Sequence, residues 1–317
     1  MVASTAGTLS SFRRAAAMFR PMLPLAKLGR ALRETGYSFI TPTPSTHRRV
    51  VARLERARTL RDVFGWSRPF SPELPGPPLL ALLEEAGALE RDGPLLRSTV
   101  RFSSLGQLLL AHSAFPTTAP DAVFFGPDTY RFASFLAARA PPRIGSVADV
   151  GCGTGAGGLL LAPRAAFVQL LDVNEKALEF ARANCELNDV SARVARSDVL
   201  TAATDPLDLI IANPPYLSDD AGRTYRDGGG TLGTGLSVRI VREALALLRP
   251  GGRLLLYTAT PVIDGEHVLC PQLAPLLRGC RHEYAELDPD VFGEELERPA
   301  YARVERIAVV GLDAVKS

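Results

Sequence analysis

Asp149-Val150-Gly151-Cys152-Gly153-Thr154-Gly155 follows an apolar run and opens the part of the chain whose pattern decides the fold. We predict a buried strand over residues 146–151 that ends in this turn. Glycines suit such a turn because the backbone needs positive φ and must approach a ligand closely. The turn indicates a site for a nucleotide-like molecule and by itself leaves open which one.

From residue 147 onward, short apolar runs alternate with amphipathic segments. Strands are predicted at 146–151, 167–173, 192–196, 207–212, 253–257 and 302–310, and helices at 174–187 and 236–248. Continuous apolar strands that alternate with helices are typical of a parallel sheet covered on both faces. The predicted fold is therefore α/β and Rossmann-like.

The first third of the chain has a different pattern. Residues 1–36 are expected to be a frayed, flexible helix or, because arginines precede any acid, an organelle targeting segment. Helices are predicted at 47–63 and 79–86, followed by strands at 88–91 and 95–103 joined by Asp92-Gly93, a hairpin signal. This order is typical of a winged-helix-like module. We expect a mainly helical accessory or substrate-recognition domain over 1–115 and a second domain over 116–317.

Charge is distributed unevenly between these two parts. The whole chain has a net charge of +2, whereas residues 1–68 hold 13 lysines and arginines against three acids. This asymmetry predicts contact with an acidic partner such as RNA or a ribosomal surface. A solvated arginine-rich face is the alternative explanation.

Composition sets further expectations. No apolar run approaches the roughly 20 residues of a membrane span. The four cysteines are widely spaced and the four histidines are isolated from one another, which predicts neither a metal site nor a disulfide framework. We expect a soluble, cytoplasmic protein without membrane or metal partners.

Three aspartates specify the expected ligand. Asp172 lies 21 residues after Gly151, where a carboxylate can accept hydrogen bonds from ribose hydroxyls. This spacing also fits a dinucleotide such as NAD. Asp149 is placed to support an ammonium group, and Asp198 to accept from an adenine amine, with a helix cap or turn as its alternative role. Because S-adenosylmethionine has both an ammonium group and an adenosine, it is the predicted cofactor. Its expected binding residues are Asp149, Gly151, Cys152, Gly153, Gly155, Asp172, Val173, Asp198, Val199 and Asn213.

Asn213-Pro214-Pro215-Tyr216 directly follows the predicted strand 207–212. Asparagine offers a neutral side-chain carbonyl, and the Pro-Pro segment holds a backbone carbonyl rigidly outward. Two acceptors on a stiff loop suit a planar NH2 group. This loop therefore predicts methylation of an amide or an aromatic amine, with Asn213, Pro214, Pro215 and Tyr216 as the catalytic residues.

Four segments, 149–159, 170–188, 208–217 and 229–256, resemble class I S-adenosylmethionine-dependent methyltransferases of the small methyltransferase superfamily. The similarity is greatest to the HemK/PrmC family, which methylates the glutamine amide of peptide release factors. The resemblance implies a seven-stranded sheet with a reversed last hairpin. It also implies that Asn213 and the Pro214 carbonyl bind the target nitrogen while Tyr216 stacks on the planar group. Segment 122–132 corresponds to a substrate-side loop of the family, so Phe125, Asp128 and Thr129 are expected beside the substrate.

The chain departs from the release-factor enzymes at two positions. It has Gly-Pro-Asp-Thr-Tyr at 126–130, where they carry Arg-Pro-Glu/Asp-Thr-Glu, and Tyr257 where they tend to have an acid. A protein glutamine amide is the expected substrate. The alternatives are an exocyclic amine of adenine or guanine in rRNA or tRNA, which the basic N-terminal region favours, and a small molecule methylated at N or O. A scaffold that binds the cofactor without catalysis is a fourth hypothesis.

Overall fold

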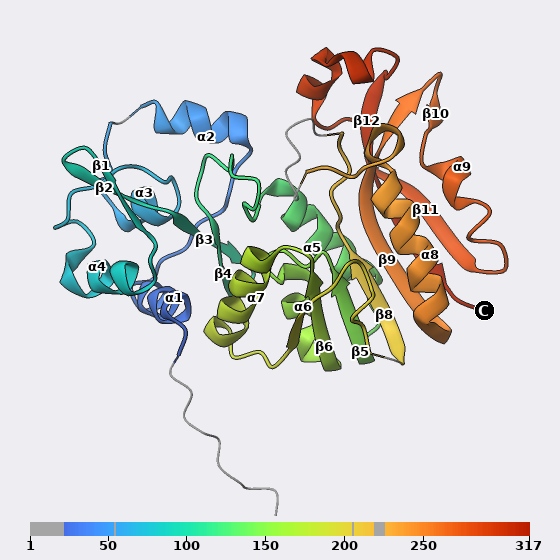
Figure 1. Cartoon of the computed structure of the whole chain (residues 1–317), viewed down its shortest axis with the longest axis horizontal. Helices are drawn as coiled ribbons and strands as arrows, with labels where there is room; N and C mark the ends of the chain where they lie inside the picture. Colours follow the sequence, from blue (N-terminus) through green and yellow to red (C-terminus); the bar gives the residue numbers. More distant parts are fainter. Residues whose placement is uncertain (1–21, 54, 205, 219–225) are drawn as a thin grey trace, which may run out of the picture.

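The computed structural model describes residues 22–53, 55–204, 206–218 and 226–317 (Figure 1). Its N-terminal part is built from four helices and two hairpins. The helices are α1 (Pro24–Glu34), α2 (Pro44–Val51), α3 (Leu60–Phe64) and α4 (Gly76–Glu85). The hairpins are β1 (Leu89–Asp92) with β2 (Leu95–Ser98), and β3 (Val100–Leu105) with β4 (Leu108–Ser113). The helix α4 and the hairpin after it follow in the predicted order, while the possible targeting segment lies mostly in residues 1–21, outside the described ranges.

Three predictions for this part are wrong. In the described portion of the segment expected to be a frayed, flexible helix over 1–36, the chain forms the packed helix α1, whose Leu28 and Leu32 are fully buried. The single helix over 47–63 is two helices, because Thr59 and Asp62 form a capping box that starts α3. The single strand over 95–103 is two strands in different sheets. The chain turns at Thr99, whose N–H donates to the carbonyl of Ala88, while the Ser98 hydroxyl bonds to Val100.

The C-terminal part is an α/β domain. Before and within the parallel region it contains α5 (Pro127–Arg139), β5 (Ile144–Val150), α6 (Ala156–Leu161), β6 (Ala165–Asp172), α7 (Glu175–Leu187), β7 (Arg193–Arg196), β8 (Leu207–Ala212) and α8 (Gly235–Leu247). It continues with β9 (Leu248–Ile263), β10 (Glu266–His267), α9 (Cys270–Leu273), β11 (Arg281–Asp288) and β12 (Arg306–Val315).

The sheet has the strand order β11-β12-β9-β8-β5-β6-β7, with β10 paired to β9 outside this path. Strands β5 to β9 run parallel to one another, whereas β12 is antiparallel to β9 and β11 is antiparallel to β12. The predicted α/β class, the parallel sheet and the reversed last hairpin are confirmed. The strand predicted at 253–257 is longer, since it extends over the whole of β9, and the last strand begins at Arg306 rather than at 302.

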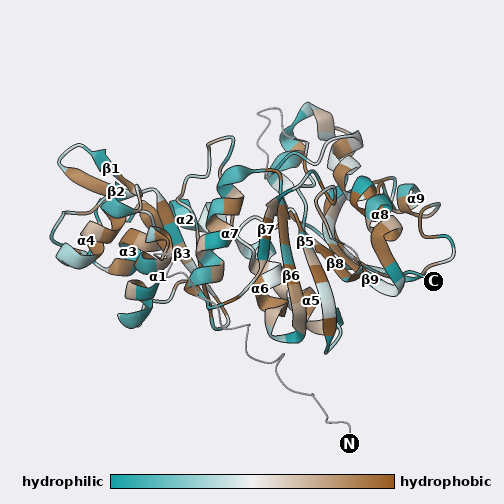
Figure 2. Ribbon diagram, turned by 60° about the horizontal axis from the view of Figure 1, so that its bottom comes forward, coloured by the Kyte–Doolittle hydropathy of each residue, from teal (hydrophilic) through white to brown (hydrophobic). Residues whose placement is uncertain are grey.

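Apolar strands lie between two layers of helices (Figures 1 and 2). One buried cluster joins the sheet to α5, α6 and α7, and another joins the opposite face to α8 and α9. Helix α7 begins where predicted, because the Asn174 side chain accepts from the Lys176 N–H. Its residues Ala177, Leu178 and Ala181 are buried.

Helix α7 also forms hydrogen bonds with the N-terminal part of the molecule. The Asn184 amide accepts from the Ala111 N–H at 2.7 Å and donates to the Ala111 carbonyl at 3.0 Å, so it pairs with β4 as a strand would. Asn188 makes the same two bonds to Leu109. On the other side, Arg30 of α1 donates to the Glu186 carbonyl. A division into two domains near residue 115 stays a prediction, and the contacts across it are specific.

Among the described residues, no helix is both long enough and apolar enough to cross a membrane.

Candidate active site

Register places the expected site residues at one edge of the sheet. Val150, the last residue of β5, pairs with Leu171 on one side and with Ala212 on the other. The carboxyl ends of β5, β6 and β8 are therefore level, and the glycine turn, Asp172 and Asn213 emerge from the same edge. Strand order reverses between β5 and β8, and in open α/β sheets ligands bind at such a reversal, outside the carboxyl ends of the strands.

The glycine turn has the conformation that its sequence predicts. Gly151, Gly153 and Gly155 have φ of +65°, +53° and +80°. A Cβ on Gly151 would meet no heavy atom within 4 Å, so open space lies against this backbone. Cys152 is buried, and burial raises the pKa of its thiol well above the usual value. It packs as a small apolar residue inside the turn, and its expected contact with the cofactor stays a prediction.

Asp172 closes this turn from the neighbouring strand. Its carboxylate accepts from the Gly153 N–H at 2.8 Å and from the Asn174 N–H at 2.9 Å. Burial raises its pKa. A carboxylate has about four acceptor positions, so two bonds leave it with capacity for further donors. Val173, next along the edge, is half exposed, and the predicted contacts of both residues with a ribose stay predictions.

Asp149 lies deeper than the turn. Its carboxylate accepts from the Gly158 N–H of α6 at 2.8 Å, and burial raises its pKa to about 7. The helix approaches this closely because glycine occupies position 158, where a Cβ would stand 2.4 Å from Leu170. Asp149 therefore bonds to the start of α6. Its predicted role toward an ammonium group stays a prediction.

Asp198 and Val199 follow β7, one strand further along the edge. Asp198 is exposed and accepts from Arg239 at 2.8 Å, which lowers the pKa of its carboxyl. Val199 is buried with a φ of +53°. Positive φ is costly for a β-branched residue, and such residues cluster at ligand sites. Their predicted packing against an adenine stays a prediction, and Arg239 is a neighbour that the sequence pattern did not indicate.

The Asn-Pro-Pro-Tyr loop leaves β8 at the same edge. Asn213 is partly exposed, and its side chain makes no hydrogen bond within the described ranges of the chain. Pro214 is buried and Pro215 partly so. Tyr216 is buried with its hydroxyl donating to Asp128 at 2.7 Å. Asn213 is thus the side chain of this loop that is free to bind a ligand, whereas Tyr216 is already held.

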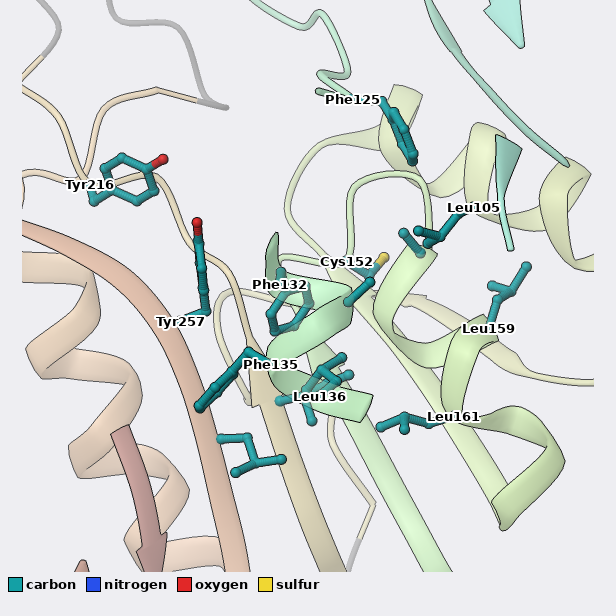
Figure 3. Close-up of a cluster of buried hydrophobic side chains, with 14 of the residues drawn as sticks. Leu105, Phe125, Phe132, Phe135, Leu136, Cys152, Leu159, Leu161, Tyr216 and Tyr257 are labelled. Atoms are coloured by element: carbon teal, nitrogen blue, oxygen red, sulfur yellow. The ribbon is translucent and has the colours of Figure 1, made fainter. Parts of the chain in front are cut away.

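Asp128 joins three elements at this point. It lies in the first turn of α5 and is buried, and it accepts from Tyr216 and, at 3.2 Å, from Tyr257 of β9. Figure 3 shows the hydroxyl ends of the two tyrosines turned toward the same region. Arg131 adds a contact to Asp128 at 3.3 Å. Tyr257, which stands where the release-factor enzymes tend to have an acid, is therefore a hydrogen-bond partner of the substrate-side segment.

The other two substrate-side residues brace the same segment. Phe125 is buried and stacks on His112 with 5.1 Å between ring centroids. The Thr129 hydroxyl accepts from the Gly126 N–H at 3.3 Å. Phe125, Asp128 and Thr129 are thus brought together beside the Asn-Pro-Pro-Tyr loop, and their contact with a substrate stays a prediction.

A glycine-rich segment over 228–235 supports the loop from behind. The Gly228 N–H donates to the Leu217 carbonyl at 2.8 Å. A Cβ on Gly228 would lie 2.7 Å from the Pro215 carbonyl oxygen, and one on Gly233 would lie 2.4 Å from that of Tyr216. These glycines let two backbones touch, a role that the sequence did not reveal although it showed the glycines.

Comparison with known proteins agrees with this arrangement. Residues 129–270 match the family model described as Methyltransferase small domain. The release factor glutamine methyltransferase of Deinococcus radiodurans is 35% identical over 162 residues, which are 47% of this chain and 55% of that protein. The ribosomal RNA small subunit methyltransferase C of Sodalis glossinidius is 39% identical over 115 residues, 36% of this chain and 30% of that protein. The chain thus spans about half, or less, of the length of these relatives.

Solved structures include similar chains at low identity. The T. thermophilus 16S rRNA N2 G1207 methyltransferase, in complex with AdoMet and guanosine, has a TM-score of 0.46 and 21% identity, covering 74% of this chain and 60% of that one. The resemblance expected from the sequence is confirmed by the family model and the two relatives. Residues 129–270, somewhat less than half of the chain, are therefore similar to the methyltransferase small domain family.

Proposed function

We propose that the protein is an S-adenosylmethionine-dependent N-methyltransferase that acts on a planar NH2 nitrogen. The observation that carries this proposal is the Asn213 side chain, which stands without a hydrogen-bond partner in the described chain, on a rigid loop level with the glycine turn. An asparagine oxygen and the Pro214 carbonyl are two acceptors for the two hydrogens of one NH2 group.

The residues at this edge fit the proposed cofactor. The backbone at Gly151 borders open space, and the Asp172 carboxylate retains acceptor capacity for a ribose. Val173 and Val199 supply apolar surface on the same side of the sheet. When bound, S-adenosylmethionine supplies a methyl group on a sulfonium centre.

The chain contributes binding and orientation. An amide or arylamine nitrogen is a weak nucleophile because its lone pair is delocalised. Asn213 and Pro214 grip the two hydrogens, favour a more pyramidal nitrogen and aim its lone pair at the methyl carbon. Such positioning lowers the activation free energy by roughly 7 kcal/mol or more. The two acceptors also stabilise the positive charge that grows on nitrogen. The released proton passes to water, so no side-chain base is required.

A glutamine amide of a protein is the proposed acceptor. The relative from Deinococcus radiodurans, named a release factor glutamine methyltransferase, supports it.

An exocyclic amine of a nucleobase is a second candidate, favoured by the surface of the N-terminal part. Around α2 and α3, six arginines are exposed, namely Arg48, Arg49, Arg53, Arg56, Arg58 and Arg61. Arginines contact phosphates, and such contacts make binding sensitive to salt.

Transfer of a labelled methyl group decides between these acceptors. The enzyme and the Asn213→Ala variant are each incubated with methyl-labelled S-adenosylmethionine and, separately, with purified release factors, ribosomal RNA or a metabolite extract. We expect label on protein, at glutamine, with the wild type and not with the variant. Label on RNA establishes the second candidate, and label on a metabolite overturns both. Absence of S-adenosylmethionine binding by calorimetry overturns the methyltransferase proposal itself.

A further inference from the structure

A small pocket lies between the N-terminal part and the substrate-side segment. Its floor consists of buried polar residues, Thr41, His47, Arg101, His112 and Ser113, and its volume is about 10 Å³. Pro44, Phe115 and Phe124 form a more exposed rim. Polar floors of this kind are unusual in a protein interior unless their groups are paired.

The polar residues of this floor form a chain of hydrogen bonds in which each member donates to the next. The His112 Nδ1 lies 3.0 Å from the Ser113 carbonyl and must therefore carry the ring hydrogen. Its Nε2 then accepts from the Ser103 hydroxyl at 2.8 Å, and Ser103 accepts from the Thr41 hydroxyl at 2.5 Å. Thr41 in turn faces Nη2 of Arg101 at 3.4 Å. The chain of donors begins at Arg101, and every other member is neutral.

Arg101 is a buried charge that has no counterion among the residues the structure describes. It is 4% exposed, its guanidinium lies over the Phe39 ring, and it forms no ion pair with any described carboxylate. Its Nε has no hydrogen-bond partner. Burial lowers its pKa to about 10, which leaves it charged at neutral pH. An isolated buried charge is strongly unfavourable.

His47 offers a second unpaired atom to the same pocket. Its Nε2 faces the Trp66 carbonyl at 2.9 Å and so donates, whereas its buried Nδ1 has no partner. Burial, and then the charge of Arg101, lowers the pKa of His47 to about 4. A negative group beside Arg101 would offset this repulsion, so the ring could take a proton and donate from Nδ1 as well.

We propose that this pocket binds a carboxylate of the methyl acceptor, held by Arg101 and His47, which both line it. Arg101 provides a charged donor, and His47 provides a buried ring nitrogen that has no partner among the described residues. That the carboxylate belongs to a methyl acceptor rests on the proposed function. That the pocket binds a carboxylate does not depend on it.

The pocket is close to the proposed site of methyl transfer. Phe125 lines the pocket, and Asp128, three residues later, holds Tyr216 of the catalytic loop. Tyr130, in the same helix turn, accepts from the Thr41 N–H at 3.0 Å. A carboxylate in the pocket would therefore anchor the acceptor beside segment 125–130, whose Asp128 holds the loop that carries Asn213.

Thermal unfolding with added acetate, at ionic strength held constant with chloride, tests the proposal. We expect saturating acetate to raise the midpoint of the wild type by about 2–4 °C and to leave Arg101→Met unchanged. Arg58→Met removes an exposed arginine from the same part of the chain and is the matched control, expected to respond like the wild type. An acetate effect that is equal in all three proteins, or absent from all, overturns the proposal and leaves a bridging water as the occupant.

Inorganic phosphate provides a parallel arm. A larger, Arg101-dependent stabilisation by phosphate than by acetate overturns the carboxylate in favour of a phosphate. Should Arg101→Met fail to fold, the His47 ring in the wild type is followed by NMR, where acetate is expected to raise its pKa and an unchanged pKa overturns the proposal. Once an acceptor is known, Arg101→Met should raise KM with kcat retained, whereas Asn213→Ala should lower kcat. The two proposals can therefore fail separately.

Discussion

The carboxyl edge of the sheet and the N-terminal part differ in how their polar side chains are paired. At the edge, Tyr216, Asp128 and Asp172 are all bonded to neighbours, and the one loop side chain without a partner in the described chain is Asn213. In the described N-terminal part, six arginines around α2 and α3 face solvent, and Arg101 is buried without an ion pair to any described carboxylate. This contrast supports the proposal that the edge carries out the reaction while charge on the N-terminal part selects what reaches it.

Substitution of Gly228 by alanine should have the largest effect. The new Cβ would lie 2.0 Å from the Gly233 carbonyl oxygen and 2.7 Å from that of Pro215, so the Asn-Pro-Pro-Tyr loop must move. We expect methyl transfer to fall by about 100-fold, the cost of a misplacement near 1 Å. Gly293→Ala, where a Cβ meets nothing within 4 Å, is the matched control and should be fully active. Normal activity of Gly228→Ala would show that the edge is not rigid.

Asp149 should make stability depend on pH. Its pKa is raised to about 7 in the folded protein by burial, whereas an unfolded aspartate titrates near pH 3.9. Between these values the folded state binds more protons, so stability falls as pH rises and levels off above pH 7. Relative to Asp149→Asn, the wild type should lose about 3 kcal/mol of unfolding free energy between pH 4 and 8. Chemical denaturation across this range measures the difference, and a constant difference contradicts the account.

Tyr216→Phe removes one hydrogen bond from a buried carboxylate. We expect the unfolding free energy to fall by about 1–3 kcal/mol, because Asp128 loses its shorter partner. Tyr257→Phe removes the longer bond of 3.2 Å and should cost less. Urea denaturation of both variants checks the order, and the reverse order would mean that Tyr257 rather than Tyr216 anchors Asp128.

The exposed arginines should have the smallest effect on stability. Arg56→Glu and Arg58→Glu change surface side chains without ion pairs in the described chain, so we expect shifts within about 0.5 kcal/mol. Calorimetry should give unchanged S-adenosylmethionine affinity. A loss of several degrees in the unfolding midpoint would show that these arginines are structural, which would remove the contrast between the two regions.

The edge was largely predictable because its determinants are local. Glycines at 151, 153 and 155 and the Pro-Pro pair restrict the backbone by themselves, and the level ends of β5, β6 and β8 follow from the parallel order. The start of α7 was predictable from the Asn174 cap for the same reason.

Contacts between distant segments were not predictable. Asp128 meets Tyr216 and Tyr257, which are 88 and 129 residues away, and nothing in the local pattern of any of them indicates the others. Arg101 looks like one polar residue in a strand, and only the folded chain reveals that it is buried without a carboxylate. The break between α2 and α3 was missed because the capping box at Thr59 lies inside an apolar periodicity that continues across it.

The central claim is that Asn213 grips the methylated nitrogen, and single-turnover methyl transfer by Asn213→Ala at saturating S-adenosylmethionine tests it most directly. Because this side chain has no partner in the described chain, the unfolding midpoint should stay unchanged. We expect the rate to fall by about 100-fold or more. Transfer at the wild-type rate by a folded, cofactor-saturated variant would contradict the account.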